Sequence, residues 1–403
     1  MTKKLTALLL ALLLLAAAGC GGNSGEEPTD PTGQGQTDNA PPPQEPEEPP
    51  TQPEEPEEPE PDPRQEAIDA LLSDMTLEEK VGQMFFVRCP DVQAAEMVSE
   101  YHLGGYLLFG RDFQDNAGEW LTAEAFTNTM AAYQAAADIP LLIGVDEEGG
   151  TVARATRNPN LFAAKRKSPQ AVYAQGGMEA ILADTRQVNE GLLSYGINVN
   201  FAPVADVSTD SADFIYDRAF GQDAAATADY VSQVVAEMDA EGIGSVLKHF
   251  PGYGSNADTH TGVAIDQRPY ETFVSGDFLP FQAGIDAGAD CVLVSHNVVT
   301  AMDDALPASL SPEVHRILRE ELGFTGVILT DDLAMDAVEA YAEDGSAAVL
   351  AVLAGNDMIV TTDYRVQIPL VIAAVEEGTV DEGLIDRAVV RVLTWKHDLG
   401  LIG

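Results

Sequence analysis

Eight short, largely apolar runs separated by longer amphipathic stretches constrain the fold of this chain more than any other feature of its sequence. Runs that are apolar throughout are typical of parallel strands covered by helices on both faces. Eight such runs within about 340 residues predict a (β/α)8 barrel of the TIM type, although their spacing also allows a doubly wound sheet. The runs are Gln83–Val87, Gly105–Phe109, Leu141–Val145, Val199–Pro203, Gly244–Lys248, Cys291–Ser295, Val327–Thr330 and Met358–Thr361.

The stretches between these runs have the composition and periodicity of helices. Thr76 and Glu79 have the spacing of a capping box, which predicts that a helix begins just before the first run. The other predicted helices are Thr122–Ala136, Met178–Leu193, Ala224–Ala240, Pro312–Glu321 and Ala347–Ala354.

The N-terminus has the pattern of a secretory signal. Lys3 and Lys4 precede the apolar run Leu5–Leu15, which is too short for a comfortable membrane span. Small residues lead from this run to Cys20, and this ending resembles a bacterial lipobox, in which the cysteine is acylated and becomes the new N-terminus. An ordinary signal peptide that contains a cysteine is the alternative. We expect a signal peptide over residues 1–19 and a lipid anchor at Cys20 that holds the protein, outside the cytoplasm, on the bacterial cell membrane.

Residues 20–63 are an acidic, proline-rich segment with almost no apolar side chains, so they cannot bury enough surface to offset the entropy of ordering. They contain 13 of the 66 acidic residues and none of the 21 basic ones. With Lys3 and Lys4 also set aside, 53 acidic and 19 basic residues remain in 64–403, a charge of about −34. This charge argues against nucleic acid or an anionic membrane surface as a direct partner. We expect a disordered tether followed by one monomeric domain.

Cys89 and Cys291 are the cysteines of this domain. Outside the cell they could form a disulfide, but each sits in or beside an apolar run. We therefore expect two buried free thiols, and two cysteines so far apart are not a metal-binding motif.

Polar residues follow the apolar runs at the point where each predicted strand ends. In a barrel, the carboxyl ends of all strands open on one face, where active sites are built. Charged residues beside a buried strand are costly unless they are used, so the pattern predicts an active site on this face. The residues are Asp146, Glu147, Glu148, Asp206, Lys248, His249, His296, Asn297, Asp331 and Asp332.

Two pairs of side chains, one at a strand end and one in a loop, have the chemistry of glycoside hydrolysis, which needs one carboxylate to attack or assist and one acid to protonate the leaving oxygen. Asp331 is the candidate nucleophile and Asp332 its rival; alternation along a strand predicts that only one of them faces the barrel axis. Asp258 and His260 lie two residues apart in a glycine-rich loop. The carboxylate would orient the imidazole and favour its protonated form, which makes His260 a candidate acid/base.

Five segments, in this order, together resemble the motifs of glycoside hydrolase family 3 β-N-acetylglucosaminidases. The resemblance covers essentially all of residues 66–403. The segments are Asp146 to Arg154 (DEEGGTVAR), Asn200 to Asp206 (NFAPVAD), Asp217 to Gly221 (DRAFG), Lys248 to Gly252 followed by Asp258 to His260 (KHFPG and DTH), and Gly326 to Met335 (GVILTDDLAM).

The resemblance implies a retaining, two-step exo-β-N-acetylglucosaminidase without metal or cofactor, acting on peptidoglycan fragments or related glycans that contain N-acetylglucosamine. It implies that Asp331 is the nucleophile and that Asp258 and His260 form the acid/base dyad. The residues that it places around the sugar are Asp146, Arg154, Arg218, Lys248 and His249.

Two departures from the family pattern fall in the acid/base loop. Tyr253 stands where the family commonly has a second histidine, and the interval from Pro251 to the dyad is one residue shorter. The chain stops at Gly403, soon after the eighth predicted unit, so we expect no second domain to supply an acid/base as in the β-glucosidase branch.

Three other functions remain as alternatives. A metal-dependent hydrolase could use His249, His260 and His296, although these show neither HExxH nor HxH spacing. A phosphorylase on the same scaffold would transfer the sugar to phosphate, with which a neutral His260 would be compatible. A surface lipoprotein could bind glycans without turning them over.

Overall fold

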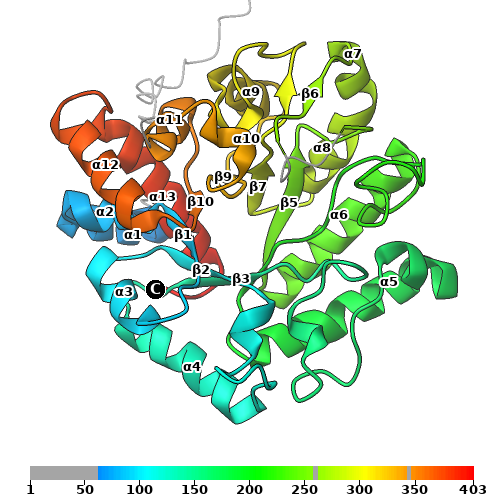
Figure 1. The fold of residues 1–403 in the computed structure, drawn as a ribbon, viewed down its shortest axis with the longest axis horizontal. Coiled ribbons are helices and arrows are strands. Elements are labelled where there is room, and N and C mark those ends of the chain that lie inside the picture. The colour runs from blue at the N-terminus through cyan, green and yellow to red at the C-terminus, as the bar shows by residue number, and fades with distance from the viewer. Residues whose placement is uncertain (1–61, 257–261, 343–345) are drawn as a thin grey trace, which may run out of the picture. The chain divides into compact units, whose positions relative to one another are not determined.

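The computed structural model describes residues 62–256, 262–342 and 346–403 (Figure 1). Eight parallel strands form one sheet in the order β10-β1-β2-β3-β4-β5-β7-β9. A parallel bridge between Leu329 and Met358 links the two outer strands and brings the sheet round into a barrel. The strands are β1 Phe85–Arg88, β2 Gly105–Leu108, β3 Leu142–Val145, β4 Val199–Asn200, β5 Gly244–Phe250, β7 Cys291–Val294, β9 Val327–Thr330 and β10 Ile359–Thr361. The predicted barrel is confirmed, because the first and last strands pair, as they do not in a doubly wound sheet.

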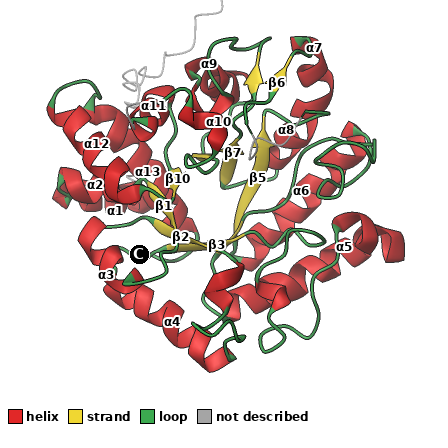
Figure 2. Ribbon diagram, viewed as in Figure 1, coloured by secondary structure: helices red, strands yellow, loops and turns green. Residues whose placement is uncertain are grey.

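Helices surround the strands (Figure 2). The capping box at Thr76 and Glu79 is present and opens α2. Helix α5 begins before the predicted Met178, because the chain continues as a helix across a break at Gly176 and Gly177. The helices are α1 Pro63–Asp74, α2 Leu77–Gln83, α3 Ala94–Tyr101, α4 Ala123–Ala136, α5 Pro169–Ser194, α6 Ala224–Glu241, α7 Tyr270–Thr272, α8 Phe278–Asp286, α9 Pro312–Arg316, α10 Asp336–Glu339, α11 Ala347–Ala354, α12 Tyr364–Glu376 and α13 Glu382–Asp398.

The inside of the barrel is packed with apolar side chains. Phe86 and Phe201 meet edge to face, with ring centroids 5.2 Å apart. Gly144 makes this contact possible, because a Cβ there would lie 2.6 Å from the Phe201 ring and 2.8 Å from the Phe86 ring. Leu107, Leu293 and other strand residues complete this interior cluster. The barrel is therefore a filled core on which a site can be built only at its ends.

A second, two-stranded sheet was not predicted. It pairs β6 (Ile265–Asp266) with β8 (Val298–Val299) and lies beyond the carboxyl ends of β5 and β7. Strands of two residues are too short to show an alternating pattern, which explains why the sequence did not indicate them.

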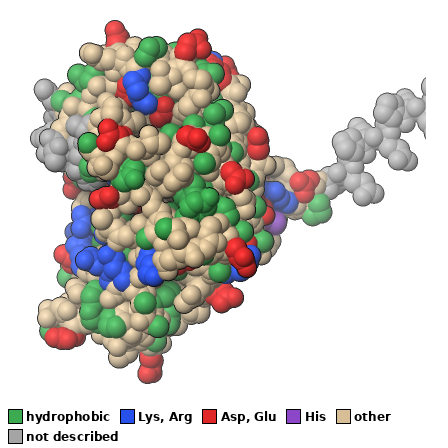
Figure 3. Space-filling view, turned by 90° about the vertical axis from the view of Figure 1, so that its right-hand side faces the viewer, with side chains coloured by type: hydrophobic (Ala, Val, Ile, Leu, Met, Phe, Trp, Pro, Cys, Tyr) green, Lys and Arg blue, Asp and Glu red, His purple; other side chains and the backbone are tan. Residues whose placement is uncertain are grey.

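Cys89 and Cys291 are both buried and unpaired, which confirms the prediction of free thiols. None of the helices in the described parts of the chain is sufficiently long and apolar to cross a membrane. On the face drawn in Figure 3, acidic side chains are spread over the surface and lysine and arginine gather mainly near one edge.

Candidate active site

A cavity of about 250 Å³ opens at the carboxyl ends of the barrel strands. Its floor is apolar and includes Phe201, Leu293 and Val360 from the interior of the barrel. Its walls bring together Asp331 and all the predicted sugar-site residues, which are Asp146, Arg154, Arg218, Lys248 and His249. The predicted dyad, Asp258 and His260, lies outside the described residues.

Lys248, near the end of β5, is 2% exposed and forms the centre of the charged side of this cavity. Its Nζ lies 2.6 Å from Asp146 Oδ1 and 2.6 Å from Glu148 Oε1. An ammonium group has three N–H donors, so these two carboxylates leave one donor for a ligand. The Asp146 side chain is 17% exposed, and its carboxylate can therefore be reached from the cavity.

Glu148 lies behind this pair and also binds Arg218. Arg218 donates from Nε to Glu148 Oε2 at 2.9 Å and from Nη2 to Oε1 at 2.8 Å. Burial alone would raise the pKa of Glu148, but Arg218 and Lys248 together hold it below its usual value. Glu148 thus accepts from both cations, while Lys248 also binds Asp146, so the charges of this corner are paired with one another.

His249 is fixed by partners on both ring nitrogens. Its Nδ1 lies 2.7 Å from Asp206 Oδ2, and Arg218 Nη2 lies 3.0 Å from Nε2. A guanidinium can only donate, so Nε2 accepts and Nδ1 carries the proton that Asp206 accepts. The geometry therefore assigns His249 as the neutral, Nδ1-protonated imidazole.

Tyr253 stands where the family motif commonly has a second histidine. It is 1% exposed and packs edge to face on His249, with ring centroids 5.1 Å apart. Its backbone N–H donates to Asp206 Oδ1 at 2.8 Å. Tyr253 thus takes part in holding His249, in addition to connecting β5 to the predicted acid/base loop.

Glu147 shapes the loop after β3 that carries Arg154. It is fully buried and accepts hydrogen bonds from the backbone N–H groups of Arg154 (2.9 Å) and Thr156 (3.2 Å) and from the Thr156 hydroxyl (2.6 Å). Gly149 and Gly150, both at positive φ, turn the chain between these points. Glu147 does not line the cavity. It is therefore a positioning residue, which holds the loop that carries Arg154.

Arg88 and Phe109 line the cavity and were not predicted. The Arg88 guanidinium carbon lies 4.3 Å from the centroid of the Phe109 ring, and that of Arg154 lies 5.9 Å from it. Among the described residues, Nε of both arginines is buried without a hydrogen-bond partner. Arg88 directly follows the first apolar run. It could therefore have been predicted from the same pattern, in which polar residues at strand ends are candidate site residues.

Asp331 and Asp332 both line the cavity, so lining does not decide which of them faces the barrel axis. Strand β9 ends at Thr330 and the chain bends there, so strand alternation no longer applies. The two aspartates differ in their hydrogen bonds. Asp332 accepts from Ala334 N at 3.0 Å, and burial, together with the neighbouring Asp331, raises its pKa. Asp331 Oδ1 accepts from Asp332 N at 2.8 Å.

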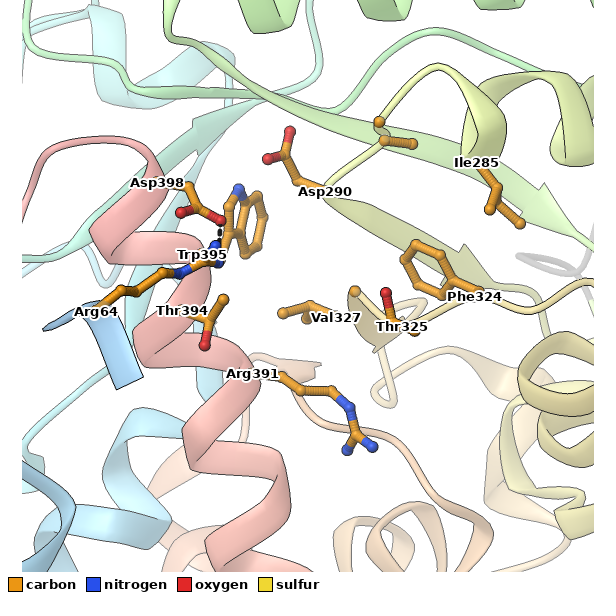
Figure 4. Close-up of a pocket in the computed structure, with 13 residues that line it drawn as sticks. Arg64, Ile285, Asp290, Phe324, Thr325, Val327, Arg391, Thr394, Trp395 and Asp398 are labelled. Carbon is orange, nitrogen blue, oxygen red and sulfur yellow. Dashed lines mark hydrogen bonds and ion pairs between the residues drawn. The ribbon is translucent and has the colours of Figure 1, made fainter. Parts of the chain in front are cut away.

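A larger cavity, of about 400 Å³, lies at the other end of the barrel strands (Figure 4). Asp290, which precedes β7, and Val327, which begins β9, line it together with Trp395 of α13. Asp290 is held by the backbone N–H (2.8 Å) and hydroxyl (2.9 Å) of Ser245. The cavity contains none of the predicted site residues, so its size does not identify it as the active site.

A metal-dependent hydrolase would use His249, His260 and His296 as ligands. Of these, His249 and His296 lie in the described part of the chain, and both have their ring nitrogens in hydrogen bonds. His249 is held by Asp206 and Arg218, as above. His296 contacts the Ser309 hydroxyl at 2.7 Å and the Asp332 carbonyl at 3.0 Å. Neither ring presents a free nitrogen to the cavity.

A barrel with aspartates and other charged, hydrogen-bonding side chains around a cavity at its carboxyl-terminal mouth has the arrangement of a glycoside hydrolase. The family model described as "Glycosyl hydrolase family 3 N terminal domain" matches residues 76–395, and the chain belongs to this family. It is 37% identical over 239 residues to a beta-hexosaminidase of Xanthomonas campestris pv. campestris (strain B100), a match that covers 58% of this chain and 70% of the relative.

Solved structures agree with this assignment. A glycoside hydrolase family 3 beta-N-acetylglucosaminidase from Paenibacillus sp. str. FPU-7 superposes with a TM-score of 0.74 at 30% identity, over 82% of this chain and 64% of that chain. The present chain thus spans slightly less than two thirds of the Paenibacillus protein. A beta-N-acetylhexosaminidase from Beutenbergia cavernae DSM 12333 superposes with a TM-score of 0.71 at 29% identity, over 80% of this chain and 99% of that chain. Together these similarities support glycoside hydrolase activity of the beta-hexosaminidase type.

Proposed function

We propose that the protein is a retaining exo-β-N-acetylglucosaminidase that removes terminal β-linked N-acetylglucosamine from peptidoglycan fragments or related glycans. The observation that supports this most directly is that Asp331 and the Asp146–Lys248 pair line one cavity with an apolar floor. At about 250 Å³ the cavity is slightly smaller than typical ligand pockets, and it suits one sugar ring rather than a continuous chain.

The charged wall gives this cavity the means to select a sugar. Asp146 can accept a hydroxyl proton, and the remaining N–H of Lys248 can donate to a neighbouring hydroxyl oxygen. Hydrogen bonds to charged groups are strong, and a buried charge left without a partner is penalised, so a substrate that lacks the hydroxyl would be rejected.

In the first chemical step, Asp331 would attack the anomeric carbon while His260 gives its proton to the leaving oxygen, which produces a glycosyl-enzyme ester and a free alcohol. In the second step, His260 would take a proton from water as the water oxygen displaces Asp331. The assignment of Asp258 and His260 to this role comes from the motif, since both lie outside the described residues.

The test is hydrolysis of p-nitrophenyl β-N-acetylglucosaminide by the full chain and by single variants. Asp331→Ala should reduce kcat by about 1000-fold or more, and His260→Ala by about 100-fold or more. Asp332→Ala is the matched control and should retain more activity than Asp331→Ala. Full activity of Asp331→Ala or His260→Ala would refute the role proposed for that residue.

The same assay separates the alternatives. Turnover that depends on added phosphate and yields a sugar phosphate would identify a phosphorylase. Turnover of the β-glucoside in place of the N-acetylglucosaminide would overturn the sugar assignment. Binding of glycans with no turnover would identify a glycan-binding lipoprotein.

We propose further that Cys20 carries the lipid that holds the enzyme on the cell membrane. The lipobox-like sequence supports this location, together with an acidic segment that would hold the domain away from the bilayer. A Cys20→Ala variant should move from the membrane fraction to the soluble fraction. Retention of that variant in the membrane fraction would contradict the anchor.

A further inference from the structure

A cluster of metal-ligating side chains lies at the opposite end of the barrel from the active site. Glu79 belongs to α2, His102 directly follows α3, and Asp138 follows α4. One possible ligand atom from each of the three residues lies within 4.8 Å of the others. The segments that carry them precede β1, β2 and β3, so the cluster is on the amino-terminal face.

His102, whose side chain is 29% exposed, contributes a ring nitrogen that makes no hydrogen bond to the described residues. This nitrogen, Nδ1, is itself buried. The carboxylate oxygen Asp138 Oδ2 lies 3.7 Å away, which is too long for a hydrogen bond. That separation is close to the roughly 3.3 Å expected between two ligand atoms on a tetrahedral ion with bonds of about 2.0–2.1 Å.

Glu79 is oriented as ligating carboxylates commonly are. Its Oε2 accepts the backbone N–H of Thr76 at 2.7 Å, which fixes the carboxylate and leaves Oε1 for an ion. Asp138 is 77% exposed in its side chain, so it can move the short distance needed to complete the site.

The three residues also border a hollow of about 150 Å³ whose walls include Leu71, Val98 and Ile139. A hollow of this size with polar side chains at its border has room for an ion and its water ligands. Two carboxylates beside one imidazole, in a chain of formal charge −45, favour a divalent cation electrostatically.

We propose that Glu79, His102 and Asp138 bind one divalent transition-metal ion, for which Zn²⁺ is the probe, with water at the remaining position. The ion would join the ends of three successive elements on the face of the barrel that serves stability rather than catalysis. It would stabilise the folded domain without taking part in glycoside cleavage, and the proposal does not depend on the proposed function.

The test is calorimetric titration of the purified full chain with Zn²⁺, with thermal unfolding in parallel. The wild-type protein should show saturable binding at this site and a rise in Tm of about 2–4 °C at a hundredfold excess over Kd. Loss of one ligand should weaken this binding by about 100-fold or more, because even partners that only orient metal ligands are worth 10–100-fold.

The variants are chosen to keep the fold. Glu79→Gln preserves the capping box, which glutamine also forms. His102→Asn suits the left-handed backbone at this position, φ 50° and ψ 41°, which asparagine tolerates. Asp138→Asn changes an exposed side chain. These three variants should each lose the Zn²⁺-dependent rise in Tm.

His397→Asn is the matched control, because His397 Nδ1 is also without a hydrogen-bond partner among the described residues but lies near one carboxylate, Asp398, at 3.6 Å. It should bind Zn²⁺ as the wild-type protein does. If the three ligand variants bind Zn²⁺ with wild-type affinity, or the wild-type protein binds none, the proposal is wrong. Binding lost only in His260→Ala would place the ion in the active site and would also overturn it.

Discussion

His249 Nδ1 donates to Asp206 Oδ2 over 2.7 Å, and this bond leaves Nε2 of His249 as the acceptor for Arg218 Nη2 at 3.0 Å. The same carboxylate accepts the backbone N–H of His249 at 3.1 Å and that of Tyr253 at 2.8 Å. One buried aspartate therefore controls both the tautomer of His249 and the path of the chain as it leaves β5.

Asp206→Asn should reduce kcat/KM by about 100-fold or more. The amide replaces one acceptor oxygen with a donor that faces an N–H group, so His249 loses either its tautomer or its position. Steady-state kinetics on the chromogenic substrate measures the effect. Asp290→Asn is the control, because Asp290 is a partly buried acceptor of a backbone N–H but lies at the far end of the barrel. It should lower stability and leave kcat/KM unchanged; equal losses in the two variants would contradict the role of Asp206.

Gly252→Ala should distort the base of the predicted acid/base loop. Gly252 has φ 116°, and a Cβ there would lie 2.4 Å from Asp277 Oδ1. Arg268 ties the two sides together, since it donates to the Gly252 carbonyl at 3.1 Å and to Asp277 Oδ2 at 2.8 Å. We expect kcat to fall by about 10-fold and the free energy of unfolding by about 1–3 kcal/mol.

The control for this change is Gly276→Ala, a nearby glycine at which an added Cβ meets nothing within 4 Å. It should leave kcat unchanged and preserve stability or raise it slightly, since alanine is the better helix former. A Gly252→Ala protein with wild-type kcat would show that the loop does not depend on its base.

The strands could be predicted from the sequence because burial on both faces leaves a continuous apolar run. Cys291–Ser295 was predicted where β7 is Cys291–Val294, and Val327–Thr330 matches β9. The predicted Gly244–Lys248 was too short, because β5 continues to Phe250 through a shift of register between Leu247 and Phe250. Polar residues ended the apolar run there, although the backbone pairing continues.

Contacts within the site could be predicted only in part. The sequence motifs contain Lys248 and Glu148. The 2.6 Å distance between Lys248 Nζ and Glu148 Oε1, however, results from the arrangement of β3 and β5 around the barrel, which no local sequence pattern encodes. The role of Asp206 was likewise hidden, because its partner His249 lies 43 positions away. Arg88, in contrast, ends β1 directly after an apolar run, so its place beside the cavity follows from the same strand-end pattern as that of the other site residues.

Glu148→Gln should destabilise the domain near neutral pH by about 3–5 kcal/mol, because it leaves Arg218 and Lys248 buried beside an uncharged group. The folded-state pKa of Glu148 lies below its usual value of 4.5, so its stabilising contribution is present above pH 4.5 and is lost as pH falls below that value. The difference in stability between wild type and variant should therefore shrink on acidification.

Urea unfolding of both proteins at pH 7 and at successively lower pH measures this difference. Glu313→Gln is the control, because Glu313 also binds an arginine, Arg316, at 2.7 Å but is 45% exposed. Its effect should be much smaller at every pH. A difference for Glu148→Gln that stays constant down to pH 3 would contradict the charge pairing described above.

Lys396→Met should remove a pH dependence of stability on the alkaline side. Lys396 is fully buried, its Nζ contacts Gln83 Oε1 at 2.6 Å, and burial lowers its pKa to about 7. Between about pH 7 and 10.5 the unfolded chain keeps this proton while the folded chain has released it. The unfolded state then binds more protons, so wild-type stability should rise with pH by about 1.4 kcal/mol per unit relative to the variant.

The stability difference between wild type and Lys396→Met, measured by urea unfolding at pH 7, 8 and 9, isolates this contribution from other groups. Lys80→Met is the matched control, because Lys80 lies 2.7 Å from Asp386 and 3.2 Å from Glu382 and its pKa is raised. Its folded and unfolded forms both hold the proton over this range, so its difference from wild type should not change. A parallel pair of curves for wild type and Lys396→Met would mean that the folded protein keeps a charged ammonium at that position.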